Sequence, residues 1–390
     1  MVIEKRILIL DFANYVDYPI GGYLSFARSM IETFGNTVAL VGIATSPSDP
    51  VGRWFIKEID GTPFDFFAFA RYKKTKTRHL LPDRLVSYPL VRYYGRKIYE
   101  KNINNIFLQR QEILMALPGF KSKNVCFCFA GLENPLSISK YSYASFIAKW
   151  FERAFFKRVR FVNTILAAGD SSSIGEMIAR SGGRLSQDQV IKFPTRINTS
   201  IFRPVGKDYA RGILNLPPER TIFVTTGRVA TLKGWKFMVD CFVQFEKSIQ
   251  DSVLYFIGEG EDEEKLKQYI YVNNLSEKIF LAGRKTPEEV VLYLNASDLF
   301  IMGSYKEGWS TSLIEAIACG VPACVTDFSS AREIIVEGVN GYVVSEHNSD
   351  RFVKAMTEAL KIRRPVNNAN VKLLSSDLLK GELLKYWKLI

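Results

Sequence analysis

Short apolar runs alternate along the chain with longer amphipathic stretches. Residues 6–12 carry a short, continuous apolar run, which is typical of a parallel strand buried on both faces. The glycine pair Gly21-Gly22, a helical stripe over 23–34 and a second apolar run at 37–42 follow it. This order predicts a βαβ unit. Further strands are predicted in the first half at 65–72, 105–109, 124–131, 161–168 and 190–193.

The second half repeats this alternation more regularly. Strands are predicted there at 221–226, 252–258, 278–283, 299–304, 322–326 and 341–344, with helical patterns between them. Such alternation indicates a doubly wound sheet in each half. Two prolines and several turn formers interrupt the periodicity over 193–204. We therefore expect an α/β protein with Rossmann-like domains at 1–198 and 199–374, and a final helix within 375–390 that could cross back onto the first domain.

The composition fits a folded two-domain protein and excludes several classes. The 390 residues are too many for one ordinary core, and 47% apolar with 24% charged residues is normal for a globular chain. The five cysteines form no C-x-x-C pair and there are only two histidines, so we expect no zinc site and a reducing compartment. No signal peptide is evident, and no run reaches the ~20 apolar residues that span a bilayer. These features predict a cytoplasmic protein.

The segment 305–322 is the strongest local signal for chemistry. It follows a predicted strand and opens a helix, with N-cap candidates at Ser310, Thr311 and Ser312. A helix N-terminus offers unpaired N–H groups and a partial positive charge, which favour a phosphate. Glu307 and Glu315 flank it and are suited to accept hydrogen bonds from sugar and ribose hydroxyls. The alternative is a capped helix with one solvated and one salt-bridged glutamate.

A second signal lies in the turn 226–234, which also joins a strand to a helix. Arg228 and Lys233 flank this turn, so both cations can reach one anion. The alternative is a pair of surface cations. Two weaker signals are the glycine turns Gly258-x-Gly260 and Gly21-Gly22, the latter at the first βα turn. A Rossmann oxidoreductase is not expected, because no G-x-G-x-x-G follows the first strand.

Together these motifs resemble the signature of glycosyltransferase family 4. The resemblance covers nearly all of 221–344 and is thinner in the first half, where Gly21-Gly22 and Asn198…Phe202-x-Pro204 match in order. It implies a GT-B fold with two Rossmann-like domains facing a central cleft, the first binding the acceptor and the second the nucleotide-sugar donor. Its motifs are Glu307-x7-Glu315 with Ala316-x-Ala318-x-Gly320-x-Pro322, Gly227-Arg228…Lys233-Gly234, Gly258-x-Gly260, Ala296-Ser297-Asp298 and Val339-Asn340-Gly341.

The resemblance also implies roles for single residues. Arg228 and Lys233 would hold the donor diphosphate, Glu307 would contact the donor sugar, and Glu315 the ribose; the first three form the expected catalytic group. With no D-x-D triplet, no metal and no cofactor are expected, since cations and a helix dipole replace Mg²⁺ at the leaving group. The expected donor-binding residues are Gly21, Gly22, Gly227, Arg228, Lys233, Gly258, Arg284, Lys285, Glu307, Trp309, Ser310, Thr311, Ser312 and Glu315.

One position departs from the family pattern. Family members often carry a histidine after a strand of the first domain, and Ala130 occupies that position here. Either the reaction proceeds without this histidine, or Glu133 or Asn134 substitutes for it, or the chain is impaired. His79 and His347 stand in other sequence contexts, and neither resembles a replacement.

Basic residues interleave with aromatic ones over 71–101 and again over 149–160, within a net charge of +12. This pattern suits an anionic bilayer surface, single-stranded nucleic acid or ordinary solvated helix faces. Because the chain also carries the signals of a donor site, we interpret the pattern as a surface for a membrane-borne acceptor and expect no nucleic-acid partner.

The sequence therefore predicts a retaining, metal-independent glycosyltransferase at the inner face of the cell membrane. It would move a sugar from a UDP- or GDP-sugar to a glycan or lipid-linked acceptor, in the synthesis of cell-surface polysaccharide, lipopolysaccharide or glycolipid. The alternative is a catalytically impaired nucleotide-sugar-binding protein of the same fold.

Overall fold

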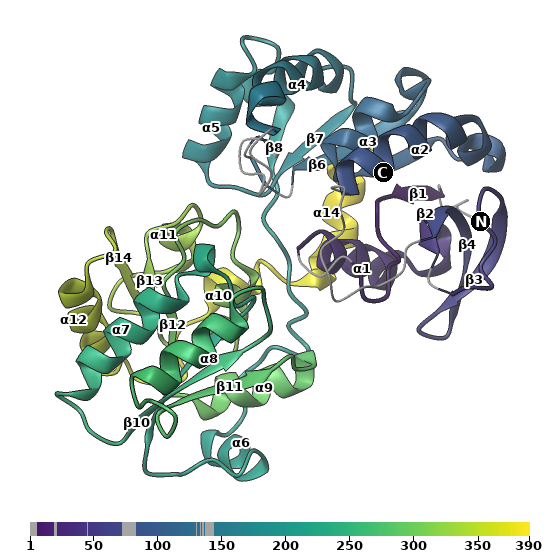
Figure 1. Cartoon of the computed structure of the whole chain (residues 1–390). Coiled ribbons are helices and arrows are strands. Elements are labelled where there is room, and N and C mark those ends of the chain that lie inside the picture. The colour runs from purple at the N-terminus through teal and green to yellow at the C-terminus, as the bar shows by residue number, and fades with distance from the viewer. Residues whose placement is uncertain are drawn as a thin grey trace. The chain divides into compact units, whose positions relative to one another are not determined.

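The computed structural model divides into two compact units, Met1–Pro194 with Leu379–Ile390 and Thr195–Leu378 (Figure 1). The structure describes residues 6–18, 22–44, 46–71, 83–129, 131, 132, 134, 136 and 144–390, with the backbone alone at 83–85 and 144–146. Gly21, His79, Ala130 and Glu133 lie outside these residues, as does the part 72–82 of the basic segment 71–101.

The first unit is built on a sheet in the order β3-β4-β2-β1-β5-β6-β7-β8 over its described residues. Its strands are parallel except for β3, which pairs antiparallel with β4. The chain moves outward from β1 on one side and then returns to its other side at β5, so the sheet is doubly wound. The strands are β1 (Ile7–Leu10), β2 (Val38–Ala44), β3 (Trp54–Ile59), β4 (Thr62–Arg71), β5 (Asn105–Leu108), β6 (Asn124–Phe129), β7 (Thr164–Ala167) and β8 (Val190–Lys192).

Successive side chains of each strand point to opposite faces of this sheet. Because the buried strands carry apolar residues on both faces, helices cover both. Leu8 and Leu10 pack toward α2 (Asp83–Ile98), α3 (Gln111–Ala116), α4 (Ala144–Val159) and α5 (Ser171–Arg180). Ile7 and Ile9 pack toward α1 (Gly22–Phe34) and α14 (Leu379–Tyr386).

The C-terminal helix belongs to the first unit. Leu379, Leu383 and Trp387 recur at the four-residue spacing of one helix face, and each is 1% exposed or less. They share a core cluster with Ile9 of β1 and Met30 of α1.

The second unit holds a fully parallel sheet in the order β11-β10-β9-β12-β13-β14. From β9 the chain proceeds to β10 and β11 on one side and then returns to β12 on the other. The strands are β9 (Thr221–Thr226), β10 (Ser252–Ile257), β11 (Ile279–Gly283), β12 (Leu299–Met302), β13 (Ala323–Thr326) and β14 (Gly341–Val344).

Helices cover both faces of the second sheet as well. Phe223 and Ile301 face α7 (Trp235–Glu246), α8 (Glu263–Val272) and α12 (Ser349–Ala359). Val224 and Met302 face α9 (Pro287–Ala296) and α10 (Thr311–Ala318). Two doubly wound α/β sheets confirm the predicted fold class.

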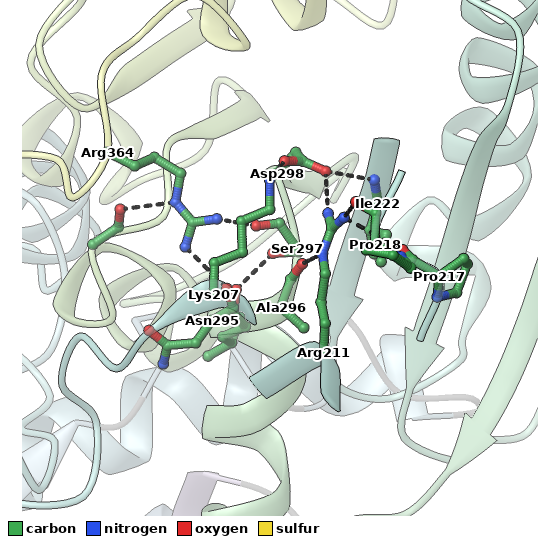
Figure 2. Close-up of polar contacts among 12 residues, drawn as sticks. Lys207, Arg211, Pro217, Pro218, Ile222, Asn295, Ala296, Ser297, Asp298 and Arg364 are labelled. Carbon is green, nitrogen blue, oxygen red and sulfur yellow. Dashed lines mark hydrogen bonds and ion pairs between the residues drawn. The ribbon is translucent and has the colours of Figure 1, made fainter. Parts of the chain in front are cut away.

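A partly buried polar clamp secures the amino ends of β9 and β12 (Figure 2). Asp298, just before β12, accepts hydrogen bonds from the backbone N–H of Ile222 at 2.8 Å and from Arg211 at 2.7 Å, and it pairs with Lys207. Arg211, in α6 (Lys207–Ile213), also donates to the carbonyl of Ala296 at 2.9 Å. Asp298 therefore ties α6, β9 and β12 together.

Arg364 completes the clamp at the ends of two helices (Figure 2). Its guanidinium donates to the carbonyls of Asn295 and Ser297 at the end of α9, and to that of Gly320 just after α10. A cation at a helix C-terminus satisfies carbonyls that have no partner inside the helix and complements the helix dipole. The motif Ala296-Ser297-Asp298 thus has a structural role here.

Candidate functional site

The candidate site lies at the carboxyl ends of β9 and β12. These strands are neighbours, and the chain reverses its winding direction between them. In open parallel sheets ligands collect at such a switch point. The loop after β9 carries Arg228 and Lys233, and the loop after β12 carries Glu307. A small cavity of about 20 Å³ lies at this edge, lined by residues that include Thr226, Arg228, Lys233 and Ser304.

Glycines allow the loops at this edge to touch backbone to backbone. A Cβ on Gly234, where φ is +70°, would lie 1.8 Å from the carbonyl oxygen of Gly303. A Cβ on Gly258, where φ is +140°, would lie 2.0 Å from the carbonyl oxygen of Gly227. No other residue type fits such approaches without displacement of the backbone. The motif glycines therefore bring the loops after β9, β10 and β12 together.

Lys233 and Glu307 form an ion pair across the two loops. The Lys233 ammonium contacts Glu307 Oε1, and the Ser304 hydroxyl donates to the same oxygen at 2.8 Å. The side chains of Lys233 and Glu307 are 26% and 11% exposed. The cation predicted to meet phosphate and the carboxylate predicted to meet sugar are therefore within reach of one point.

Arg228 extends from the same turn but stays open to solvent. Its side chain is 52% exposed, and its closest carboxylate, Glu261 Oε2, is 3.7 Å from Nη1. A pair at this distance and exposure contributes little. The Arg228 guanidinium thus remains available to an incoming anion.

Asp262 anchors the turn between these two cations and was missed in the sequence. It is 3% exposed, and its Oδ2 accepts hydrogen bonds from the hydroxyl of Thr231 at 2.5 Å and from Trp235 Nε1 at 3.4 Å. Hydrogen bonds from Lys265 and Thr231 lower the pKa of Asp262 to about 2. Its position after Gly258-x-Gly260, at the same sheet edge as the turn, is the signal that could have found it.

Helix α10 points its N-terminus at the turn that carries Arg228. Ser310 is the N-cap, and its hydroxyl accepts a hydrogen bond from the Leu313 N–H at 3.3 Å. The Ser312 hydroxyl lies 3.6 Å from where a Cβ on Gly227 would stand. Thr311 and Ser312 are half-buried in the first turn, and Trp309 packs partly buried against the core below.

Glu315 lies one turn inside α10 and is half-buried. In the described part of the chain no hydrogen bond or ion pair engages its carboxyl group, so the salt bridge that the alternative gives to one of the two glutamates lies at Glu307 and not at Glu315. Desolvation raises its pKa to about 8. A desolvated carboxyl group without a partner lowers the stability of the fold. Such a group is therefore a candidate to contact a ligand.

The remaining predicted residues are spread more widely. Arg284 and Lys285 follow β11, two strands away from β9, and Lys285 pairs with Glu289 at 3.4 Å. Gly22 begins α1 in the first unit. Asn134 donates to the carbonyl of Ala148 at 2.9 Å and is 8% exposed, so it takes part in local structure.

The first unit has its own polar cluster at the corresponding switch point, between β1 and β5. Asp11 and Arg110 pair while 1% and 7% exposed, and the Arg110 guanidinium lies 4.8 Å from the centre of the Tyr23 ring. Gln109 donates to Asp11 Oδ2 at 3.4 Å and to the Tyr23 carbonyl at 3.2 Å. This cluster was not predicted from the sequence, because it joins residues about a hundred positions apart.

Two further features of the described residues concern metal ions and membranes. Within the described ranges, no group of three or more His, Cys, Asp or Glu side chains is arranged to hold a metal ion. Among the helices that the structure describes, none is both long and apolar enough to cross a bilayer.

Comparison with known proteins identifies the class. Residues 207–371, which lie in the second unit, match the family Glycosyl transferases group 1. The predicted resemblance to glycosyltransferase family 4 is therefore confirmed. A sucrose-phosphate synthase from Thermosynechococcus elongatus has the same fold, with a TM-score of 0.77 over 98% of each chain at 17% identity.

Two curated relatives show what related domains do. The poly(glycerol-phosphate) alpha-glucosyltransferase of Bacillus subtilis is 30% identical over 42% of this chain and 24% of its own length. The UDP-Gal:alpha-D-GlcNAc-diphosphoundecaprenol alpha-1,3-galactosyltransferase of Escherichia coli is 26% identical over 42% of this chain and 43% of its own length. The match thus spans less than half the length of either relative.

Proposed function

We propose that this protein is a retaining, metal-independent glycosyltransferase that moves a hexose from a UDP-sugar to a glycan or lipid-linked acceptor. The observation that carries the proposal is the convergence of Arg228, Lys233, Glu307 and the N-terminus of α10 at one switch point. Two cations and a helix dipole suit a diphosphate, and a carboxylate beside them suits sugar hydroxyls. UDP is preferred over GDP because the Escherichia coli relative is named for UDP-Gal.

In this proposal the ion pair between Lys233 and Glu307 opens when the donor binds. The Lys233 ammonium turns to the diphosphate, and Glu307, still held by the Ser304 hydroxyl, accepts hydrogen bonds from the sugar. Arg228, Lys233 and the N–H groups of α10 then stabilise the negative charge that develops on the leaving diphosphate. Glu315 contacts the ribose from inside the helix.

A membrane-borne acceptor is the second part of the proposal. Helices α2 and α4 cover one face of the first sheet, and they expose Tyr93 at 78% and Trp150 at 71%. The same two helices also expose basic residues near these rings in the sequence: Arg92, Arg96, Lys149, Arg153 and Lys157. Exposed aromatic rings among cations suit the interface of an anionic bilayer. The protein would then work as a peripheral protein at the inner face of the cell membrane.

Calorimetry with UDP, GDP and ADP, followed by hydrolysis of UDP-glucose and UDP-galactose with and without EDTA, tests the proposal. We expect UDP to bind most tightly, and we expect EDTA to change the rate of sugar release by no more than about twofold. Strict dependence on Mg²⁺ or Mn²⁺ would remove the metal-independent mechanism. Binding of UDP without release of sugar from either donor would favour the alternative, a nucleotide-sugar-binding protein with impaired catalysis.

A further inference from the structure

His347 lies outside both loops of the candidate site but reaches them. It follows β14 in the loop that leads to α12. Its Nε2 is 3.1 Å from the carbonyl oxygen of Gly303, which directs a proton to Nε2 for donation. Its ring stacks on Tyr305, with centroids 3.9 Å apart and planes 8° apart, and meets the edge of Phe237 at 5.0 Å.

Two of these partners, Gly303 and Tyr305, lie in the loop after β12 that carries Glu307, and the third, Phe237, lies in the helix that follows the turn of Lys233. Tyr305 precedes Glu307 by two positions, and its N–H donates to the carbonyl of Leu232 at 3.0 Å. The Gly303 carbonyl packs against Gly234, directly after Lys233. Phe237 stands in the first turn of α7, which follows the same glycine. One imidazole therefore touches the loop after β12 and the start of the helix after the β9 turn.

Tyr305 is exposed, so the contacts with His347, called the brace below, matter for the order of its loop. Tyr305 is 53% exposed, and its chain neighbour Lys306 is exposed as well, so the outer half of this loop lacks a surrounding core. Loops with few buried apolar contacts open easily. Because Nε2 is committed to a backbone carbonyl and one ring face is covered by Tyr305, the geometry suits support of the loop rather than proton transfer to a substrate.

We propose that His347 is a positioning residue of the donor site, which holds the loop of Glu307 against the turn of Lys233. The effect of His347 on catalysis rests on the proposed function of Lys233 and Glu307. The contact by which His347 holds the loop against the turn does not depend on that function. His347 takes this role from the second unit and does not stand in for the histidine that the family often carries in the first.

Hydrogen exchange of the whole chain tests the brace without any donor. In His347→Ala we expect the Tyr305 amide to exchange about tenfold faster or more, because its bond to Leu232 opens more often. The amides of Val224 and Val325 in the central strands should not change. The control is Glu346→Ala, whose partner Arg351 is 3.6 Å away with both side chains about two-thirds exposed. Equal Tyr305 exchange in wild type and His347→Ala would overturn the brace.

Kinetics on the same variants tests the positioning role. With UDP-glucose and UDP-galactose, His347→Ala should lower kcat for sugar release about tenfold, because a displaced contact residue costs rate even when the ligand still binds. The Kd for UDP should stay within about threefold, since Arg228 and α10 are untouched. His347→Phe keeps the ring contact and should recover most of the rate, whereas Glu346→Ala should behave as wild type.

The possible outcomes separate the two proposals. If wild type binds neither UDP nor a UDP-sugar, the proposed function fails while the exchange result still decides whether the brace exists. If wild type is active and His347→Ala exchanges faster but keeps its kcat, the positioning role is overturned. If His347→Phe is as slow as His347→Ala, the stacking contact on Tyr305 is not the part that matters, and the proposal fails in that form.

Discussion

Lys233 and Glu307, 74 positions apart in the sequence, form an ion pair at the carboxyl edge of the second sheet. Each is a residue that the family resemblance assigns to a different part of the donor. In this structure each side chain therefore neutralises the charge of the other. A donor that separates them must supply a phosphate for the lysine and hydroxyl groups for the glutamate, which favours a complete nucleotide sugar over a bare anion.

Removal of either cation should weaken binding of UDP. We expect Arg228→Ala and Lys233→Ala each to raise the Kd by an amount equivalent to roughly 1–3 kcal/mol, the loss of a charge-assisted hydrogen bond. Titration calorimetry measures this directly. Lys236→Ala is the matched control, because Lys236 lies three positions later, is 59% exposed, and contacts Asp240 on its own helix and the Tyr269 ring of α8. Unchanged affinity in both test variants would remove these residues from the diphosphate site.

Glu307→Gln should separate catalysis from nucleotide binding. The substitution removes the charge that pairs with Lys233, so the lysine is freed for phosphate and the Kd for UDP should stay equal or fall. Turnover should drop by about tenfold or more, because the sugar loses a charged acceptor at the reacting end. The measurement is kcat for sugar release beside calorimetry with UDP. A variant that loses UDP affinity and keeps its rate would show that the roles of Glu307 and Glu315 are interchanged.

Glu315 should make stability depend on pH. Desolvation raises its pKa from 4.5 to about 8 in the folded chain. A raised carboxyl pKa means that the folded state favours the neutral form, so this group's contribution is fully present below pH 4.5 and is lost as the pH rises toward 8. Glu315→Gln stays neutral throughout. We expect the variant to gain stability relative to wild type between pH 5 and pH 8, on the order of 2–4 kcal/mol.

Urea denaturation at pH 5 and pH 8 measures this difference. Glu264→Gln serves as the control, because the Glu264 side chain is 86% exposed and its substitution should shift stability equally at both values. If the difference between Glu315→Gln and wild type does not grow with pH, the carboxyl group is not desolvated in the folded chain.

The sequence predicts the sheet of the second unit closely because its strands are continuous apolar runs. β9 and β14 begin and end at the predicted residues. In the first unit the strand β3 was missed, although it forms a hairpin with β4 through Asp60-Gly61. Both turn residues have positive φ, +47° and +74°, and an Asp-Gly pair between two apolar runs is a recognised hairpin signal. The turn chemistry was present in the sequence and was not used.

The site was predictable where its parts are close in the sequence. Arg228 and Lys233 share one turn, and Ser310 caps its helix as the pattern indicates. The partner of Lys233, the anchoring role of Asp262 and the brace at His347 depend on which strand ends meet at the sheet edge. That order is a property of the whole topology, and no local pattern carries it. The same holds for Asp298, whose family motif gave no sign that it secures the opposite edge.

The exposed rings of α2 and α4 should bind an anionic membrane. We expect the protein to co-sediment with vesicles of phosphatidylcholine and phosphatidylglycerol at low salt and to be released at high salt, as charge screening requires. Trp150→Ala and Tyr93→Ala should each weaken binding several-fold through loss of the interfacial ring. Lys149→Gln and Arg153→Gln should weaken it about fivefold each, since one cation near an anionic surface contributes about 1 kcal/mol.

The second unit offers a matched control for the aromatic contribution. Tyr271 in α8 is 78% exposed, the same fraction as Tyr93, but the basic residues over 149–160 belong to the other unit. Tyr271→Ala should therefore sediment as wild type does. If neutral and anionic vesicles carry down the same amount of protein, or if Tyr271→Ala weakens binding as much as Tyr93→Ala, the α2 and α4 surface is not the membrane contact. Binding of a single-stranded oligonucleotide that Trp150→Ala abolishes would instead assign the same rings to base stacking.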